Sequence, residues 1–179
     1  MGRDKALLEF DGQTLIERAV GKLDAVCAVV AIAGGGDSLR QFGTVVPDRW
    51  AGCGPLGGIG AALEVSEWDW NLFLAVDVPL VPVELLRRLA MRCLQTSGVA
   101  VMMRVEGRIE PLCAVYHRRV LTGIEASLAQ GNYKVSTAIE GVSEVEYLEV
   151  DGDDANWFLN VNTPQELLTA ERCVGRYRI

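Results

Sequence analysis

The sequence predicts an α/β fold in which a mostly parallel β-sheet is covered by helices on both faces. Short apolar runs rich in β-branched residues alternate along the chain with segments of helical periodicity, which is the pattern of a parallel sheet. Half of the 179 residues are hydrophobic, which excludes a disordered chain. This length suits one domain over residues 1–179 with a substantial core.

The first half of the chain supplies helices and strands in alternation. Thr14 and Glu17 predict the capping box of a helix over residues 14–23. Residues 26–33 are a continuous apolar run, as in a strand that is buried on both faces. The elements expected next are a short helix from residue 37, a brief strand at 44–46, a helix at 55–65 and a buried strand at 71–76.

The second half of the chain adds a hairpin and a well-marked helix start. The turn at Glu106 and Gly107 joins two strand-like runs, which predicts one antiparallel insertion in the sheet. Thr163, Pro164 and Glu166 combine a cap, a proline in the first helical position and a capping-box glutamate. The other elements expected here are helices at 82–94 and 119–129, strands at 99–104 and 112–116, and an alternating edge strand at 145–150.

The composition argues against several classes of function. A net charge of −7 disfavours nonspecific nucleic-acid binding, which needs a surplus of Lys and Arg. The chain has no apolar run long enough for a membrane span, and its charged N-terminus is unlike a signal peptide. The five cysteines form no CxxC pair, so we expect reduced thiols in a cytoplasmic protein.

Asp77 is the first candidate for a functional side chain. Ligands of open parallel sheets bind beyond the carboxyl ends of the strands, so the loops after residues 33, 46, 76 and 161 are where we expect a site. Asp77 directly follows an apolar strand, and a carboxylate there needs a cationic partner. Magnesium bound to a nucleotide typically takes one or two carboxylates plus phosphate oxygens. We therefore predict metal binding by Asp77, ahead of the alternative that it caps the next helix.

Two other polar segments are candidates for ligand contacts. Gly2, Arg3 and Lys5 could wrap a polyphosphate, although composition alone favours a frayed terminus. Asn160 and Asn162 stand at alternate positions, so both side chains face the same way in an extended segment. Such amides can bind a heteroaromatic ring, a phosphate or metal-bound water, and turn chemistry is an equal alternative.

A glycine-rich segment carries a rival signal. Gly52, Gly54 and Gly57 match GxGxxG, and Asp77 lies twenty residues further on, where a dinucleotide fingerprint has its ribose-binding acid. Against this hypothesis, four residues precede Gly52 after the expected strand and its proline, and Pro55 removes one backbone amide. An ordinary strand-to-helix turn is the third interpretation.

The chain offers little for general base catalysis. His117 is the only histidine, and we expect it to be structural or exposed to solvent. A transferase whose nucleophile is a phosphate monoester needs no general base, because that group is mostly doubly charged at neutral pH. Catalysis then depends on positioning and charge neutralisation.

Taken in order, these segments resemble the motifs of the molybdenum cofactor guanylyltransferase family. Residues 1–8 are similar to the end of its signature LAGGxSxRMGxDKxLL, and residues 54–59 are similar to its GPLAGI segment. Residues 77–79 resemble its metal-binding DxP, and residues 160–164 resemble its NVNTP. The resemblance covers essentially the whole chain, and the ordered set is more specific than any one motif.

The resemblance implies a fold, a reaction and a set of site residues. The implied fold is a three-layer α/β/α sandwich of the nucleotide-diphospho-sugar transferase type. The implied reaction uses Mg²⁺ to transfer GMP from GTP to the terminal phosphate of molybdopterin, and releases pyrophosphate. Transient contacts with other cofactor-biosynthesis proteins or molybdoenzymes are also compatible with it. By position, the implied contacts are Arg3 and Lys5 with the GTP phosphates, Asp48, Gly54, Pro55, Leu56 and Gly57 with guanosine, Asp77 with Mg²⁺, Asn160 and Asn162 with the pterin and the reacting phosphates, and Lys134 with the pterin phosphate.

The chain departs from the family pattern in two places. Residues 31–34 read Ala-Ile-Ala-Gly where many members carry Asn near the base, which puts that guanine contact in doubt. The chain also starts at the Met of the signature, so the preceding strand and its LAGG loop are absent, through either a late start codon or a true fragment. We therefore expect weak GTP binding or none, and recovery of binding when an upstream strand and glycine loop are restored.

Three other hypotheses remain open at this point. The first is a nucleotidyltransferase of the same fold that uses a sugar phosphate or a cytidylyl donor. The second is an oxidoreductase that binds a nucleotide cofactor at Gly52, Gly54 and Gly57, and it predicts stabilisation by NADH without metal. The third is a non-catalytic fragment or binding module.

Overall fold

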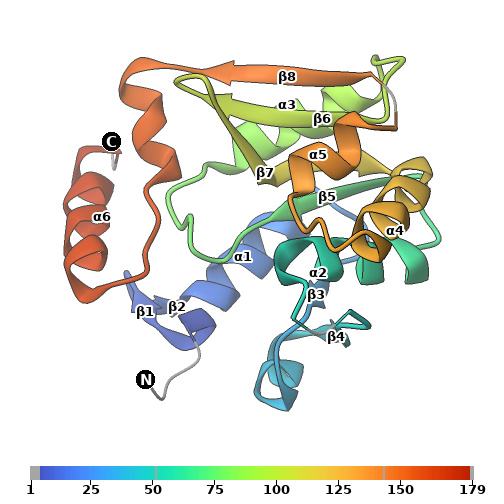
Figure 1. Ribbon diagram of the computed structural model, residues 1–179. Helices are drawn as coiled ribbons and strands as arrows, with labels where there is room; N and C mark the ends of the chain where they lie inside the picture. Colours follow the sequence, from blue (N-terminus) through green and yellow to red (C-terminus); the bar gives the residue numbers. More distant parts are fainter. Residues whose placement is uncertain (1–4, 51, 143, 178–179) are drawn as a thin grey trace.

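The computed structural model describes residues 5–50, 52–142 and 144–177, and Figure 1 shows their arrangement. The strands are β1 (Glu9–Phe10), β2 (Gln13–Thr14), β3 (Ala31–Ala33), β4 (Thr44–Val46), β5 (Trp70–Leu74), β6 (Ala100–Val105), β7 (Arg108–His117) and β8 (Val145–Val150). The α-helices are α1 (Leu15–Asp24), α2 (Gly54–Val65), α3 (Val83–Cys93), α4 (Leu121–Ala129), α5 (Val135–Glu140) and α6 (Pro164–Tyr177). Shorter 3-10 helices are η1 (Lys5–Leu7), η2 (Asp37–Phe42), η3 (Arg118–Val120) and η4 (Gly152–Phe158).

A four-stranded sheet in the order β5-β7-β6-β8 forms the centre of the molecule. β7 pairs antiparallel with both β5 and β6, whereas β6 pairs parallel with β8. It follows that β5, β6 and β8 run in one direction and that β7 alone opposes them. The expected mostly parallel sheet with one antiparallel insertion is confirmed, and β8 lies at the edge, as its alternation predicted. Two smaller pairs, antiparallel β1–β2 and parallel β3–β4, lie apart from this sheet.

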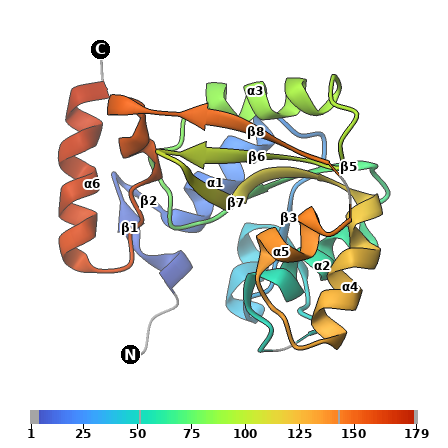
Figure 2. The ribbon, with the colours of Figure 1, turned by 45° about the horizontal axis from the view of Figure 1, so that its top comes forward.

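Helices cover both faces of the central sheet. Successive side chains of a strand point to opposite faces, and β6 shows this directly. Ala100 and Met102 pack in one core with residues of α2, α4 and α5, whereas Val101 and Met103 pack in another with residues of α3. Figures 1 and 2 show α3 on one side of the sheet and α4 and α5 on the other. This confirms the sheet covered on both faces that the sequence pattern predicted, and it is the three-layer α/β/α arrangement that the family resemblance implied.

Both predicted capping boxes are present. The backbone N–H of Thr14 donates to Glu17 Oε2 at 2.8 Å, and the N–H of Glu17 donates to Thr14 Oγ1 at 3.3 Å. At the start of α6, the N–H of Thr163 donates to Glu166 Oε2 at 2.9 Å, and the N–H of Glu166 donates to Thr163 Oγ1 at 3.2 Å. Each pair satisfies backbone donors that the first helical turn leaves free, which fixes where α1 and α6 begin.

The prediction of a long, doubly buried strand over residues 26–33 is wrong. Only Ala31–Ala33 forms a strand, and both of its alanines are exposed. Val26 and Cys27 donate their backbone N–H groups to the carbonyl of Leu23, so the chain is still leaving α1 there. β4 is the one described strand that pairs with β3, and this leaves much of the apolar run at the surface.

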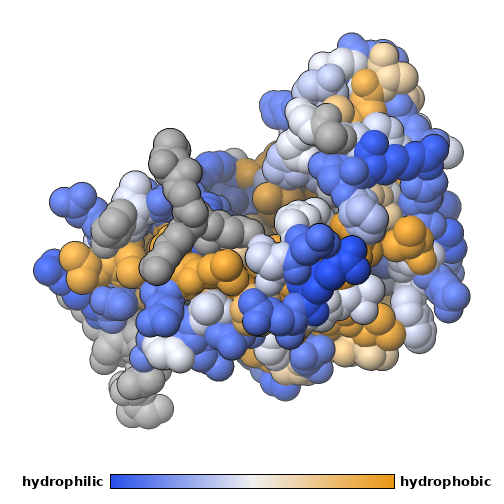
Figure 3. All heavy atoms as spheres, turned by 90° about the horizontal axis from the view of Figure 1, so that it is seen from below, coloured by the Kyte–Doolittle hydropathy of each residue, from blue (hydrophilic) through white to orange (hydrophobic). Residues whose placement is uncertain are grey.

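β5 is also less buried than a central strand. Every residue of β5 is half-buried, because β7 covers one edge and no other strand of the described ranges pairs with the second edge. Seen from below, hydrophobic residues reach the surface between hydrophilic ones (Figure 3).

None of the helices in the described ranges is long and apolar enough to cross a membrane. All five cysteines are free thiols.

Candidate active site

The turn after β5 places Asp77 beside the chain that leads into α6. The strand ends at Leu74, and Asp77 lies in the loop that leads to α3. The carbonyl oxygen of Asp77 accepts a hydrogen bond from the backbone N–H of Val161 at 2.8 Å. This bond holds the segment of Asn160 and Asn162 against the Asp77 turn. Val161 is fully buried between the two exposed asparagines, as expected for alternate residues of an extended segment.

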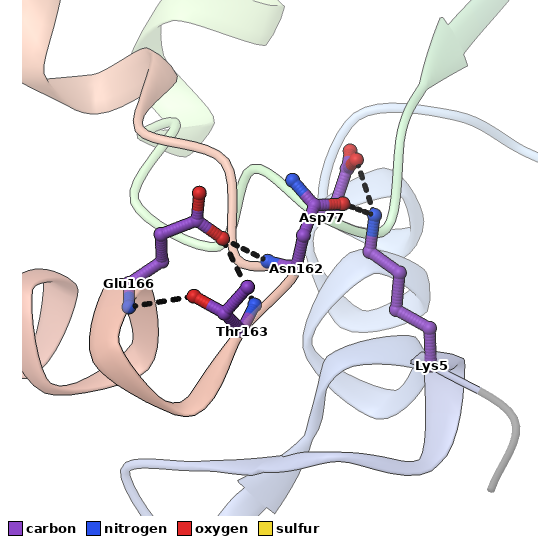
Figure 4. Close-up of polar contacts among 5 residues, drawn as sticks. All are labelled: Lys5, Asp77, Asn162, Thr163 and Glu166. Carbon is purple, nitrogen blue, oxygen red and sulfur yellow. Dashed lines mark hydrogen bonds and ion pairs between the residues drawn. The ribbon is translucent and has the colours of Figure 1, made fainter. Parts of the chain in front are cut away.

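A lysine from the N-terminal segment completes this cluster. The Nζ atom of Lys5 lies 2.6 Å from Asp77 Oδ2, and it also donates a hydrogen bond to Asn162 Oδ1. Figure 4 shows Lys5, Asp77 and Asn162 converging from three separate segments of the chain. The side chains of Lys5 and Asp77 are 37% and 23% exposed, so the cluster is open to a ligand from solvent. Three candidates from separate sequence motifs thus meet at one point.

A pocket of about 250 Å³ opens beside Asp77. Its lining combines the polar side chains of Asp77, Glu110 and Asn160 with apolar groups of Val135 and Phe158. Small-molecule sites commonly have this composition of apolar walls with a few polar groups, although this volume lies just below the usual lower bound of about 300 Å³. Sequence analysis identified Asp77 and Asn160 but missed Glu110 and Phe158.

The predicted guanosine segment forms the turn that begins α2. Gly54 has φ +61°, a conformation that favours glycine, and Pro55 lies in the first turn of the helix. Asp48 Oδ1 accepts a hydrogen bond from the backbone N–H of Trp50 at 2.9 Å. A Cβ atom on Gly57 would lie 2.9 Å from the Trp50 carbonyl oxygen and 3.0 Å from Asp48 Oδ1, so the close approach of this turn to the helix needs glycine. Leu56 is fully buried and anchors the helix in the core.

This geometry does not suit a dinucleotide fingerprint. In such a fingerprint the first glycine directly follows the strand and opens the helix. Here β4 ends at Val46, and the first glycine is Gly52, six residues further on. Asp77 is engaged by Lys5 and lines the pocket.

Two of the remaining residues, Lys134 and His117, take no part in the contacts of this cluster. Arg3 is outside the described residues. Lys134 is exposed and is the N-cap residue of α5, where its backbone N–H donates to Asn132 Oδ1 at 3.2 Å. It directly precedes Val135, which lines the pocket. His117 accepts a hydrogen bond at Nδ1 from the backbone N–H of Arg119 and packs edge-on against Trp70, which is the structural role expected for it.

The oxygen atoms around Lys5 suit a hard cation. The described residues contain no group of three or more His, Cys, Asp or Glu side chains that could hold a metal ion. Asp77 and Asn162 nevertheless direct two oxygens at one positive charge, the Lys5 ammonium. Magnesium needs few protein ligands when nucleotide phosphates supply the others. The residues therefore fit a nucleotide-bound Mg²⁺ ion better than a metal centre made of protein ligands alone.

A half-buried lysine holds the Asp77 turn from the other side. Lys22 of α1 donates from Nζ to the Pro79 carbonyl oxygen at 2.6 Å. Burial, with a smaller repulsion from Arg18, lowers the pKa of Lys22 from 10.5 to about 7. The folded chain therefore releases this proton at a lower pH than the unfolded chain does.

Replacing Lys22 with methionine is expected to remove the part of the pH dependence of the free energy of unfolding that comes from this lysine. Between about pH 7 and about pH 9 the unfolded chain binds more protons at Lys22, so its contribution to the free energy of unfolding rises with pH. We expect the parent chain to gain about 1–2 kcal/mol relative to the Lys22→Met variant over this range. Urea unfolding of both proteins at the two pH values measures the difference. Parallel changes in the two proteins would contradict it.

Comparison with known proteins agrees with this geometry. A family model described as a MobA-like NTP transferase domain matches residues 1–145. A molybdenum cofactor guanylyltransferase of Photobacterium profundum is 35% identical over 170 residues, which cover 93% of this chain and 86% of that protein. A probable molybdenum cofactor guanylyltransferase of Pelotomaculum thermopropionicum is 39% identical over 178 residues, which cover 95% of this chain and 85% of that protein.

Solved structures show the same fold. The molybdopterin-guanine dinucleotide biosynthesis protein A of Archaeoglobus fulgidus superimposes with a TM-score of 0.79 at 24% identity, over 98% of this chain and 92% of that one. A Mycobacterium tuberculosis protein in complex with manganese superimposes with a TM-score of 0.67 at 19% identity, over 96% of this chain and 93% of that one.

The fold, the ordered motifs and these matches define a nucleotidyltransferase of the α/β/α class. Within that class, the chain belongs to the MobA-like NTP transferase family, in which its similar relatives are molybdenum cofactor guanylyltransferases.

Proposed function

We propose that this chain transfers GMP from GTP to the terminal phosphate of molybdopterin and releases pyrophosphate. The observation that carries the proposal is the meeting of Lys5, Asp77 and Asn162 beside the pocket. A cation, a carboxylate and an amide at one point suit the handling of triphosphate charge. The names of the similar relatives support GTP as the donor and molybdopterin as the acceptor.

The donor would bind between the N-terminal segment and α2. Lys5, with Arg3 near it in sequence, would neutralise phosphate charge. Free backbone N–H groups and the helix dipole at the start of α2 favour an anion there. Asp48 and the turn from Gly54 to Gly57 would hold the guanosine, with the backbone brought close because Gly57 has no side chain.

The transfer itself needs no protein base. An oxygen of the acceptor phosphate attacks the α-phosphorus of GTP, and the bond from that phosphorus to the bridging oxygen breaks, so pyrophosphate leaves with the electron pair. The attacking oxygen already carries negative charge at neutral pH. Asp77 would hold Mg²⁺ together with phosphate oxygens, and the ion, when bound, supplies further neutralisation of the phosphate charge. A manganese-bound structure of the same fold supports the use of a divalent cation.

The acceptor, molybdopterin, would bind in the pocket beside Asp77. Asn160 lines the pocket beside Asp77, and its amide can hydrogen-bond the pterin or the reacting phosphates. Lys134 would receive the pterin phosphate, since it precedes the pocket residue Val135. We place the reaction in the cytoplasm, where the five free thiols would stay reduced.

The choice of nucleotide tests the proposal. Thermal unfolding is measured with millimolar GTP, CTP or UTP, each with Mg²⁺, because ligands of the native state raise its stability in proportion to RT ln(1 + [L]/Kd). High nucleotide concentration makes weak binding measurable as well. We expect GTP to give the largest increase in the melting temperature.

Other outcomes would point elsewhere. A larger shift with CTP would favour a cytidylyltransferase of the same fold. Stabilisation by NADH without metal would favour the oxidoreductase hypothesis. The absence of any ligand-dependent shift, both in this chain and after an upstream strand and glycine loop are restored, would favour a non-catalytic module.

A further inference from the structure

The pairing of β6 with β7 has an irregularity beside the pocket, where β7 carries extra residues. On β6, Met102 pairs with Ala114, yet its neighbour Met103 pairs with Glu110, so the residues from Pro111 to Cys113 have no partner on β6. Proline lacks the N–H that a regular ladder needs. The hydroxyl of Tyr116, which is fully buried, donates to the Pro111 carbonyl oxygen at 2.6 Å and holds the bulge. Bulges of this kind redirect side chains and are common next to active sites.

The bulge leaves the Glu110 side chain in the pocket with Asp77 and Asn160. Its Oε1 atom is buried, and the Arg108 guanidinium lies 2.7 Å from it as an ion pair. The Glu110 side chain is 21% exposed, whereas that of Arg108 is 65% exposed. Burial raises the pKa of the Glu110 carboxyl above its ordinary value, and Arg108 opposes this rise.

An ionised carboxylate has about four acceptor sites, and the ion pair with Arg108 leaves most of them open, so a ligand in the pocket can donate to Glu110. The walls around it are apolar and come from Leu112, Val135 and Phe158. A flat ring with N–H groups on one edge satisfies both features. The 2-amino-4-oxopyrimidine edge places an amino group beside a ring N–H, and a carboxylate can accept from both.

We propose that Glu110 determines the specificity of the acceptor pocket by accepting hydrogen bonds from the 2-amino-4-oxopyrimidine edge of a pterin. The inference rests on the proposed function, which assigns guanine to the loop after β4 and leaves this pocket to the acceptor. Guanine carries the same edge, so the experiment must separate the two sources.

The test compares two pteridines that differ at one position. Pterin has the amino group at carbon 2, whereas lumazine has an oxygen there, and the fluorescence of each reports its binding to the full chain. We expect the parent chain to bind pterin at least about fivefold more tightly than lumazine, since one charged hydrogen bond distinguishes them. Glu110→Gln is expected to weaken pterin binding about tenfold or more and to leave lumazine binding within about twofold.

The matched control is Glu84→Gln, which removes the same charge from a surface pair with Arg87 on α3. It is expected to leave both pteridine affinities unchanged, and circular dichroism of each variant checks its fold. An unchanged ratio of pterin to lumazine affinity in Glu110→Gln would overturn the proposal. So would a parent chain that binds the two pteridines equally or binds neither.

Three further outcomes separate this inference from the proposed function. If Glu110→Gln weakens GTP binding and leaves pterin binding intact, the acid contacts guanine and the inference fails. A chain that ranks GTP above CTP and UTP but does not distinguish pterin from lumazine keeps the proposed function and loses this inference. A chain that distinguishes the pteridines through Glu110 but prefers CTP keeps the inference and loses the proposed donor.

Discussion

Asp77→Asn is expected to lower GMP transfer by about 10³-fold while the fold stays intact. The amide has nearly the same shape as the carboxylate and can still accept from Lys5, so the loss is one of charge. The Lys5–Asp77 pair is partly exposed, and such pairs contribute less than about 1 kcal/mol to stability. A large loss of rate with a small change in melting temperature would identify Asp77 as a residue of the reaction. Pyrophosphate release from GTP and acceptor measures the rate.

Asp37→Asn provides the matched control. It removes the same charge from an exposed pair with Arg40 in η2, far in sequence from the cluster. We expect its rate and its GTP-induced shift in melting temperature to equal those of the parent chain. The Asp77 variant should lose the part of that shift that depends on Mg²⁺. Retention of more than about a tenth of the parent rate would rule out the proposed role of Asp77.

The parts of the fold that could be predicted depend on residues close together in the sequence. The capping boxes at Thr14 and Thr163 each involve residues three apart, so the pattern alone fixes the geometry. The alternation of Asn160 and Asn162 required only that the segment be extended. Asp77 was found because an acid after an apolar strand has few explanations other than a cation.

The features that were missed depend on distant neighbours. The apolar run at 26–33 has the composition of a buried strand, but burial depends on which strands flank it, and the sequence of the run does not contain that information. α5 has six residues and no side-chain cap, which is too short for a periodic signal. Glu110 fell between the two expected strands at 99–104 and 112–116 and gave no sign of a site, because the bulge beside the pocket involves the distant hydroxyl of Tyr116. The one local sign was Pro111, which cannot donate to a regular ladder.

The convergence of the site was only partly predictable. Each motif indicated a loop at the same edge of the sheet, which is a property of parallel topology. The contact of Lys5 with Asp77 spans 72 positions, and its contact with Asn162 spans 157. Such contacts depend on the packing of η1 against α1 and on the hydrogen bond that holds Val161, in the segment before α6, to the carbonyl oxygen of Asp77. Composition had favoured a frayed N-terminus, whereas the structure gives Lys5 two partners.

Lys5→Met is expected to change two properties in opposite directions. The Lys5 ammonium group donates to the side-chain oxygens of Asp77 and Asn162. Its removal therefore leaves the Asp77 carboxylate free for a metal ion. We expect Mn²⁺, used as a spectroscopic probe without nucleotide, to bind the variant more tightly than it binds the parent. GMP transfer should nevertheless fall by about 10²-fold, because the triphosphate loses a positive charge that stabilises its developing negative charge.

This pair of results separates a catalytic lysine from a purely structural one. A lysine that only neutralised Asp77 could be replaced by the metal ion, so its loss would raise metal affinity and leave the transfer rate near that of the parent. A lysine that only secured the N-terminal segment would lower the melting temperature and the rate together. Lys134→Met removes another exposed lysine that has no contact with Asp77 among the described interactions, and it should leave Mn²⁺ affinity unchanged. Tighter metal binding together with slower transfer in Lys5→Met is expected only if the ammonium moves from the carboxylate to the phosphates when the nucleotide binds.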